Sequence, residues 1–178
     1  MKIQNTKFKG LKIIIGQKFI DSRGYFRELI KEKIFKKNRF IFWCMSKSKK
    51  NVLRGLHFQK KNQQEKIVSV IKGSVLDIAV DLRRNSKYFG QYFKIKLSEK
   101  NCKSILIPKG FAHGFLGLEL ENIIVYGNTN YRSKKDEIGL LWNDRDLAIR
   151  WPKKKMIVSK KDRNNITLKR FIEKKIIL

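Results

Sequence analysis

The stretch Lys66–Arg83, KIVSVIKGSVLDIAVDLR, decides the fold. Its apolar residues recur at every second position on both sides of Lys72–Gly73, which is typical of two β-strands around a turn. In the first strand Val68 and Val70 share one face. In the second strand the alternation separates an apolar face from a face that also carries carboxylates: Leu76, Ile78 and Val80 on one side, and Val75, Asp77, Ala79 and Asp81 on the other.

The stretches around this segment continue in the same short-strand manner, broken by glycine turns. They are YFGQYFKIKLS (88–98), SILIPKGFAHGFLGLEL (104–120) and NIIVYGNTNY (122–131). Only YFRELIKEKIFKK (25–37) and the tail NNITLKRFIEKKIIL (164–178) have a composition that favours helix. No repeat, linker or low-complexity tract divides the chain. The sequence therefore predicts a single all-β domain over residues 1–178, either a sandwich or a barrel.

The net charge of +28 raises the question of a nucleic-acid partner. Lysine, however, is spread along the whole chain, and arginine, which makes bidentate contacts with bases and phosphates, is the minority cation. We therefore read the charge as solvated surface and expect no nucleic-acid site. Cys44 and Cys102 form no disulfide framework, no apolar run has the length of a membrane span, and the N-terminus lacks the apolar core of a signal peptide. These features predict a cytoplasmic protein that does not enter a membrane.

The only two histidines both lie in apolar, glycine-bearing stretches. His57 belongs to NVLRGLHFQ (51–59) and His113 to IPKGFAHGF (107–115). Their wide separation and the lack of an HxH pair argue against a metal site, and we expect no metal. The sequence also lacks GxGxxG, GxxxxGK[ST] and GxSxG, so dinucleotide sites, P-loops and serine hydrolase elbows are not predicted.

Taken alone, a histidine on a strand is more often a core residue whose hydrogen bonds are made within the protein than a catalytic residue. The neighbours of His57 change that interpretation. Arg54 beside it favours a neutral imidazole that can act as a base. Asp77 points inward with Val75 and Ala79, and Lys66 opens the same pair of strands. Buried charges of this kind are costly for stability, so their convergence indicates a functional site.

Several motifs resemble the dTDP-4-dehydrorhamnose 3,5-epimerase family. In chain order they are FIDSRGYFRE, SKSKKNVLRGLHFQ, SVLDIAVDLRRNSKYFGQ, LSEKN, IPKGFAHGF, YGNTNY and LLWNDRDLAIRWP. The resemblance runs from about Phe19 to Asp162. It implies a metal-independent, cofactor-free cupin jelly roll, a double-stranded β-helix with short flanking helices. It also implies a homodimer that exchanges N-terminal strands between its subunits.

The resemblance further implies inversion of C3 and C5 of a dTDP-4-keto-6-deoxyhexose, the reaction that leads toward dTDP-L-rhamnose. By motif matching, His57 corresponds to the base, Asp162 to the carboxylate that orients it, Tyr126 to the acid on the opposite face and Lys66 to the cation near the enolate oxygen. The remaining matches are positions that bind the nucleotide sugar: Arg23, Glu28, Arg54, His113, Glu137, Lys161 and the inward-facing Asp77.

Three positions depart from the family pattern. Phe42 and Cys44 replace a Gln-x-Asn pair that touches the substrate, and Arg132 replaces an aromatic residue near the nucleotide base. The catalytic set is therefore intact while part of the recognition set is changed. Two alternatives stay open on these grounds: an epimerase that acts on another nucleotide sugar or inverts only C3, and a non-catalytic cupin that binds sugar nucleotides. A nucleic-acid-binding β-barrel is a third alternative, motivated by charge alone.

Overall fold

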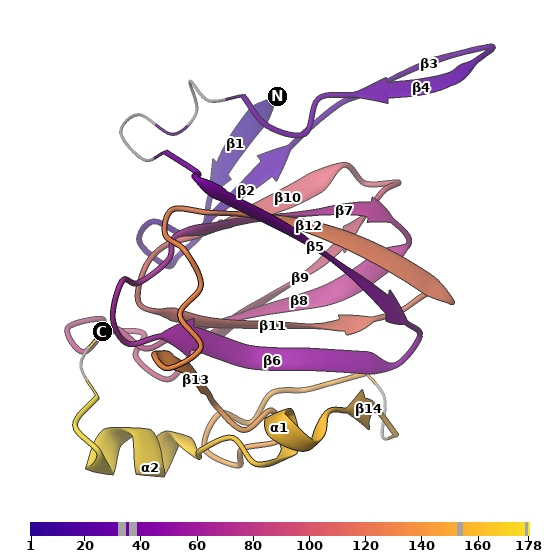
Figure 1. Ribbon diagram of the computed structural model, residues 1–178. Helices are drawn as coiled ribbons and strands as arrows, with labels where there is room; N and C mark the ends of the chain where they lie inside the picture. Colours follow the sequence, from indigo (N-terminus) through magenta and orange to yellow (C-terminus); the bar gives the residue numbers. More distant parts are fainter. Residues whose placement is uncertain (32–34, 36–38, 153–154, 177) are drawn as a thin grey trace.

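Two β-sheets face each other in the computed structural model, which describes residues 1–31, 35, 39–152, 155–176 and 178 (Figure 1). The upper sheet in Figure 1 has the order β1 (Lys2–Asn5), β2 (Lys12–Ile15), β10 (Lys103–Ile107), β7 (Lys66–Lys72), β12 (Glu121–Asn128) and β5 (Phe42–Lys49). The lower sheet has the order β13 (Glu137–Gly139), β6 (Val52–Gln59), β11 (Phe111–Gly117), β8 (Ser74–Asp81) and β9 (Tyr92–Ser98), with β14 (Ile157–Val158) parallel to β6. This arrangement is a cupin-type jelly roll, as the sequence predicts.

The stretch that decides the fold forms β7 and β8 around the expected turn, but the two strands do not pair with each other. β7 pairs with β10 and β12, whereas β8 pairs with β11 and β9, so the turn carries the chain from one sheet to the other. Gly73 at the turn has a φ of +78°, and a Cβ there would lie 2.2 Å from the Glu121 carbonyl oxygen. A residue with a side chain would therefore clash with the backbone of β12.

The alternation predicted for these strands is confirmed by where their side chains are buried. Val68, Val70, Val75 and Ala79 belong to the core between the sheets. Ile78 and Val80 point the other way and pack, with Leu56 and Phe58 of β6, against the C-terminal segment. The lower sheet is thus covered on both faces, which explains why β8 is apolar on both sides.

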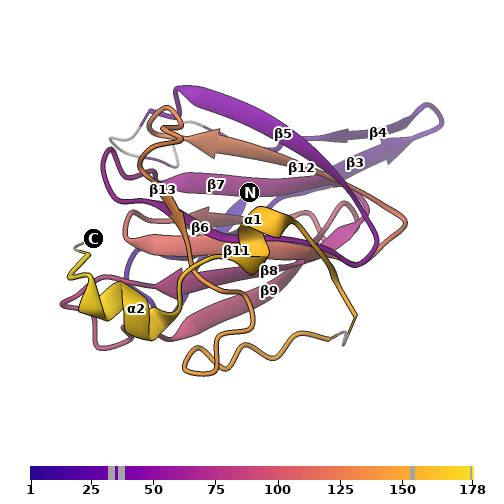
Figure 2. The ribbon, with the colours of Figure 1, turned by 60° about the horizontal axis from the view of Figure 1, so that its bottom comes forward.

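The C-terminal segment lies against the outer face of the lower sheet (Figures 1 and 2). The expected tail helix is present as α2 (Leu168–Glu173), which begins after the N-cap Thr167. A second short helix, α1 (Lys160–Arg163), was not predicted. Its N-cap Ser159 accepts a hydrogen bond from the Asp162 backbone N–H, so its sequence signal was a serine followed three residues later by an acidic residue.

The helix expected over residues 25–37 is absent from residues 25–31, whereas Phe35 has a 3₁₀-helical conformation. The first residues of this stretch end strand β4 (Gly24–Arg27), which pairs with β3 (Lys18–Asp21) in a two-stranded hairpin. Aromatic residues favour strands, and the Phe19 and Phe26 rings lie 6.3 Å apart across this hairpin. Residues 32–34 and 36–38 lie outside the described residues. Among the helices that are described, none is long and apolar enough to cross a membrane.

The first prediction concerns Phe171 of α2, which is 1% exposed and packs edge to face on Phe58 at 5.6 Å between ring centroids. Phe171→Ala should lower the free energy of unfolding by about 3–5 kcal/mol, because it leaves a cavity between the helix and the lower sheet. Urea unfolding measures this loss. The neighbouring Ile172, 54% exposed, provides the control, and Ile172→Ala should change stability by less than about 1 kcal/mol. Equal losses would show that α2 is not packed as described.

Candidate active site

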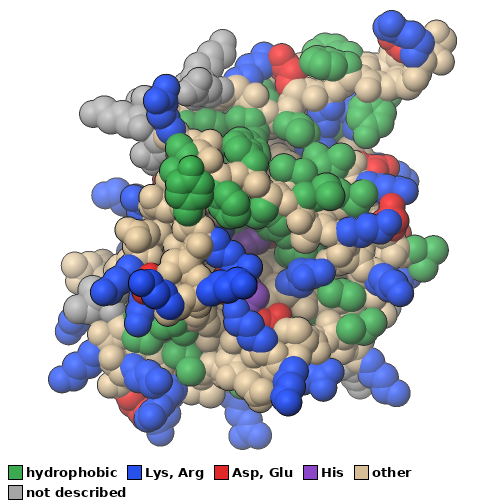
Figure 3. All heavy atoms as spheres, in the orientation of Figure 1, with side chains coloured by type: hydrophobic (Ala, Val, Ile, Leu, Met, Phe, Trp, Pro, Cys, Tyr) green, Lys and Arg blue, Asp and Glu red, His purple; other side chains and the backbone are tan. Residues whose placement is uncertain are grey.

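The two histidines are direct partners across the strand pair β6–β11, so the lower sheet brings the two histidine-bearing stretches together. The strands approach closely here because Gly55 faces Gly114. A Cβ on Gly55 would lie 2.6 Å from the Gly114 Cα, and its φ of +128° also favours glycine. Figure 3 shows histidine side chains in a hollow between the upper and lower halves of the molecule, with Lys and Arg side chains around it. This hollow is the candidate active site.

His57 is bound to a carboxylate from the far end of the chain. Its Nε2 lies 2.6 Å from Asp162 Oδ1, and Asp162 also accepts a hydrogen bond from the Gly55 N–H at 3.4 Å. Burial alone would raise the pKa of Asp162, but the hydrogen bond and charge of His57 hold that pKa below its usual value. An ionised Asp162 fixes the proton on Nε2, which leaves Nδ1 as the basic nitrogen of His57.

His113 forms a second imidazole–carboxylate pair, with its Nε2 2.8 Å from Asp77 Oδ2. This pair is far more enclosed than the first: the His113 and Asp77 side chains are 6% and 0% exposed, against 28% for His57. The other oxygen of Asp77, Oδ1, is buried and has no hydrogen-bond partner among the described residues. Of the two imidazoles, His57 is therefore the one that an incoming molecule can reach.

The upper sheet contributes Tyr126 from β12. Its ring centroid lies 6.3 Å from that of His113, and its hydroxyl lies 2.8 Å from Ser46 Oγ of β5. Burial raises the pKa of Tyr126, and the hydrogen bond with Ser46 only partly offsets that rise. Tyr126 is therefore protonated at neutral pH, as a proton donor must be.

Lys66 begins β7, where it pairs in register with Asn128 of β12 and Ile107 of β10. Burial lowers the pKa of Lys66, and the negative charges of Glu137 and Asp77 act in the opposite direction. A compact ammonium group held in this way is suited to stabilise negative charge that develops on a nearby oxygen.

Glu137 of β13 joins two cations at the edge of the site. Arg132 donates to both of its oxygens, at 2.7 and 3.1 Å, and Lys161 of α1 donates to Oε1. Burial would raise the pKa of Glu137, but the two cations lower it to about 2. With two cations against one carboxylate, this edge of the hollow carries an excess of positive charge. Arg54 lies five residues before Gln59, the register partner of Glu137, and its Nε binds Ser48 Oγ at 2.9 Å.

The structure brings together most of the residues expected from the sequence: His57, Asp162, Tyr126, Lys66, Arg54, His113, Asp77, Glu137 and Lys161. It does not bring Arg23 or Glu28 to them within one chain. The Arg23 side chain is 88% exposed at the tip of the β3–β4 hairpin and pairs with Asp21, and Glu28 pairs with Lys31. Figure 1 shows this hairpin projecting away from the two sheets.

The three positions that depart from the family pattern also lie around the site. Cys44 is the register partner of Tyr126, and its Sγ lies 3.8 Å from Asn128 Nδ2. The Phe42 ring lies 6.0 Å from that of Tyr131. Arg132 occupies the charged edge described above.

Two residues that support the site were missed by sequence reasoning. Ser46 follows Phe42 and Cys44 at strand spacing, and this period of two was the available signal. Gln59, 5% exposed, accepts a hydrogen bond from the Ser133 N–H at 2.7 Å and donates to the Tyr131 carbonyl at 3.3 Å. It ties the loop after β12 to the end of β6, a contact between distant segments that no local pattern shows. In the described part of the chain, no group of three or more His, Cys, Asp or Glu is placed to hold a metal ion.

Comparisons with known proteins agree with this geometry. The family described as dTDP-4-dehydrorhamnose 3,5-epimerase matches residues 5–170. The chain is 43% identical to the dTDP-4-dehydrorhamnose 3,5-epimerase of Methanothermobacter thermautotrophicus over 89% of this chain and 90% of the relative. It is 39% identical to that of Escherichia coli over 99% of this chain and 100% of the relative. A crystal structure of dTDP-6-deoxy-D-glucose-3,5-epimerase from Legionella pneumophila, in complex with dTDP-4-keto-L-rhamnose, superposes with a TM-score of 0.93 at 38% identity, covering 99% of this chain and 96% of that one.

The pairing of Glu137 predicts how stability depends on pH. Because its pKa is lowered in the folded state, Glu137 stabilises the fold above the ordinary carboxyl pKa of 4.5, and this contribution is lost as the pH falls toward about 2. Glu137→Gln should therefore cost about 1–2 kcal/mol of unfolding free energy at pH 7 and clearly less at pH 3.5, measured by urea unfolding.

Glu173 serves as the control because its ion pair with Arg170 is exposed. Glu173→Gln should change stability by less than about 1 kcal/mol at either pH. A cost for Glu137→Gln that does not vary with pH would contradict the assigned ion-pair network.

Proposed function

The chain belongs to the dTDP-4-dehydrorhamnose 3,5-epimerase family, and from that premise we propose that it inverts C3 and C5 of a dTDP-linked 4-keto-6-deoxyhexose on the way to dTDP-L-rhamnose. Enzymes of this family are isomerases. The observation that carries the proposal is the pairing of an accessible His57–Asp162 dyad from the lower sheet with a protonated Tyr126 from the upper sheet. A base and an acid on opposed walls are what inversion at carbon requires.

The chemistry begins with the C4 ketone, which acidifies the hydrogens on both neighbouring carbons. His57 removes the proton from C3 or C5, and the imidazolium that forms is stabilised by Asp162 at 2.6 Å. The electron pair left on carbon delocalises onto the ketone oxygen as an enolate. The Lys66 ammonium stabilises this negative charge.

Tyr126 then completes the inversion by giving its proton to the carbon from the face opposite His57. The proton on His57 is released to solvent, and Tyr126 is reprotonated before the second carbon reacts. The enclosed His113–Asp77 pair lies beneath Tyr126, so we assign it to shaping and holding the pocket rather than to proton transfer. No cofactor takes part in these steps.

The positive edge of the hollow supports binding of the nucleotide diphosphate. Lys161 and Arg132 supply two cations there against the single carboxylate of Glu137. Arginine and lysine are the side chains that bind phosphate oxygens, and the excess of positive charge favours an anionic ligand. Arg23 would add a further cation if it came from a second subunit.

We further propose a homodimer in which the N-terminal hairpin of each subunit lies on the other. The hairpin exposes large apolar side chains on both strands: Phe19, Ile20, Tyr25 and Phe26. An isolated two-stranded hairpin is marginally stable in water, so these residues need cover. β5 is an edge strand of the upper sheet, and its unpaired edge is open to a further strand.

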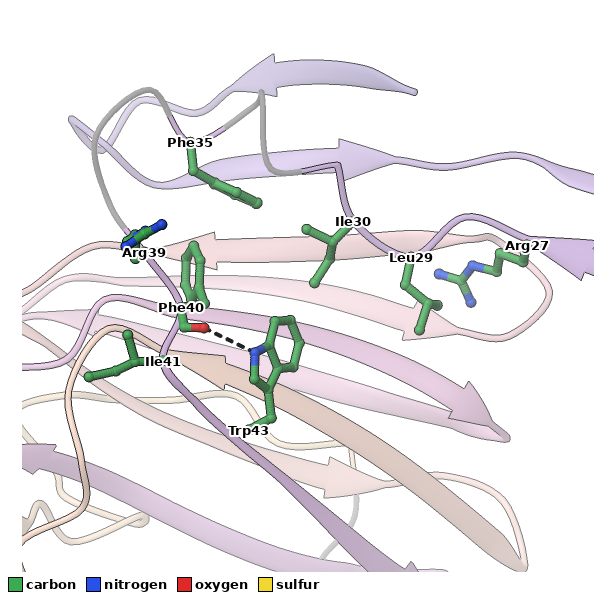
Figure 4. A pocket seen from close by; sticks show the side chains of 8 residues that line it. All are labelled: Arg27, Leu29, Ile30, Phe35, Arg39, Phe40, Ile41 and Trp43. Carbon is green, nitrogen blue, oxygen red and sulfur yellow. Dashed lines mark hydrogen bonds between the residues drawn. The ribbon is translucent and has the colours of Figure 1, made fainter.

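Beside β5 lies a pocket of about 770 Å³ with an apolar lining (Figure 4). Trp43 and Phe40 form one part of it, and Ile30 and Leu29 face them from the segment that follows the hairpin (Figure 4). A partner hairpin seated here would cover apolar surface on both subunits.

A second candidate function is favoured by Phe42, Cys44 and Arg132. Because recognition residues are changed while the dyad and Tyr126 are present, the same chemistry can act on a different nucleotide sugar or on C3 alone. Comparing exchange rates at C3 and C5 for sugars carried on dTDP and on other nucleotides separates these possibilities. We also propose a cytoplasmic location, which the free thiols of Cys44 and Cys102 support.

The role of His57 gives a direct test of the proposed function. His57→Ala should reduce exchange of substrate hydrogens with heavy water at C3 and C5 by at least ~10²-fold, because no neighbouring base replaces it. NMR of the substrate measures this exchange. The melting temperature and the affinity for dTDP should stay close to those of the wild type, since the side chain is partly exposed. Exchange at the wild-type rate would remove His57 from the mechanism.

The dimer is tested by placing a charge on the hairpin. Phe26→Asp should convert the protein to a monomer in light-scattering measurements, because a buried unpaired carboxylate is costly at an interface. Leu120→Asp is the control, since Leu120 is 84% exposed in the turn between β11 and β12. It should leave the molar mass unchanged. A Phe26→Asp protein with the molar mass of a dimer would show that the hairpin does not form the interface.

A further inference from the structure

Ser46 contacts the hydroxyl group of Tyr126, and the proposed mechanism assigns no role to this contact. On β5 it pairs in register with Ile124, two pairs along from the Cys44–Tyr126 pair, so Ser46, Cys44 and Tyr126 all face the same side of the upper sheet. Ser46 Oγ lies 2.8 Å from Tyr126 Oη, and it is the one hydrogen-bond partner of that hydroxyl among the described residues. Among the described residues, the hydrogen bonding of the proposed acid therefore depends on this serine.

The direction of this hydrogen bond determines what Tyr126 can do. If Tyr126 donated to Ser46, its proton would point into the wall of the sheet and away from the substrate. If Ser46 donates to Tyr126 Oη, the phenolic proton stays free to reach the substrate carbon. In the second arrangement, Ser46 still donates a hydrogen bond to Tyr126 Oη after the phenolic proton has gone. Oη then carries a negative charge in largely apolar surroundings, so this hydrogen bond stabilises it.

We propose that Ser46 is a positioning residue for inversion: its hydroxyl donates to Tyr126 Oη, which aims the phenolic proton at the substrate and stabilises the phenolate that remains. This inference rests on the proposed function, since it presumes that Tyr126 is the acid. In the transfer, the Tyr126 O–H bond breaks, a C–H bond forms at the substrate carbon, and the enolate electron pair enters that bond. Ser46 keeps its own proton throughout.

The burial of Tyr126 explains why such a donor is needed. Its ring packs against the core between the sheets, with the Phe115 ring 6.4 Å away, and burial raises its pKa. Arg54 lowers that pKa through its charge, yet no cation contacts Oη among the described residues, so Ser46 makes the one direct contact that favours the phenolate. A hydrogen bond to a charged oxygen contributes more than one between neutral groups, so losing it should slow proton donation by about tenfold or more.

The test compares two rates measured on the same sample in heavy water, the exchange of hydrogen at C3 and the formation of inverted product. Proton removal depends on His57 and Lys66, whereas inversion also needs Tyr126. Ser46→Ala should therefore keep exchange within about threefold of wild type and lower inversion by about tenfold. KM should change little, because Ser46 binds the tyrosine rather than the substrate. Ser46→Thr keeps the hydroxyl and should restore most of the inversion.

Ser69 provides a matched control. It is 2% exposed in the same sheet, and its hydroxyl bonds to that of Ser104 at 2.6 Å. Ser69→Ala thus removes a buried hydroxyl–hydroxyl hydrogen bond that does not involve Tyr126, and the ratio of inversion to exchange should stay at the wild-type value. If Ser69→Ala lowers the ratio as much as Ser46→Ala does, Ser46 acts through general packing and the inference is wrong.

Tyr126→Phe separates failure of this inference from failure of the proposed function. If Tyr126→Phe inverts its substrate as fast as wild type, Tyr126 is not the acid, and the mechanism fails together with the role of Ser46. If Tyr126→Phe loses inversion but Ser46→Ala keeps the wild-type ratio, the mechanism stands and only the role of Ser46 is overturned. The double variant Ser46→Ala/Tyr126→Phe should be no slower than Tyr126→Phe alone, and a further loss would show that Ser46 acts by another route.

Discussion

The hydrogen bond between His57 Nε2 and Asp162 Oδ1 is the contact on which the rest of the site depends. It joins β6 to a helix of four residues whose sequence position is more than a hundred residues away. A helix this short has no stability of its own, so Asp162 is held by the Ser159 cap and by the packing of the C-terminal segment on the lower sheet. The outer layer of the molecule thus fixes the geometry of the proposed base.

A comparison of the two imidazole–carboxylate pairs shows how similar contacts acquire different roles. The two histidines lie on adjacent strands and are direct partners in the sheet, but Asp77 comes from the neighbouring strand β8 and Asp162 from helix α1. The His113–Asp77 pair is closed off from solvent, whereas His57 remains accessible. Exposure therefore decides which imidazole can exchange a proton with a substrate.

The alternation of apolar residues was sufficient to predict the strands of this fold, but not to predict which strands pair with each other. The alternation in Lys66–Arg83 correctly predicts two strands and the faces they present. It does not show that the turn at Gly73 passes between sheets, because that depends on contacts with β10, β11 and β12. The helix predicted over residues 25–37 is absent from residues 25–31 for a related reason: the pairing of residues 24–27 with β3 outweighs local helix propensity.

The site residues could be predicted where they belong to sequence motifs. They could not be predicted where segments distant in the sequence simply meet in space. Asp162, Tyr126 and Lys161 came from resemblance, since no spacing in the sequence relates them to His57. Ser46 and Gln59 were missed because their partners lie on other strands. Arg23 and Glu28 were expected near the substrate, yet within one chain Arg23 lies at the tip of a projecting hairpin and Glu28 just after it, so a role at the site would require the second subunit proposed above.

In the proposed reaction, one enzyme without a cofactor inverts two carbons by proton transfer to and from solvent. A complete turnover of wild-type protein with dTDP-4-keto-6-deoxyglucose in heavy water, followed by NMR of the product, tests this reaction. We expect a sugar inverted at C3 and C5 that carries solvent deuterium at both positions, with no added metal or nucleotide cofactor. Inverted product that retains its original hydrogens at C3 and C5, or a substrate that binds but exchanges nothing, would contradict the proposed reaction.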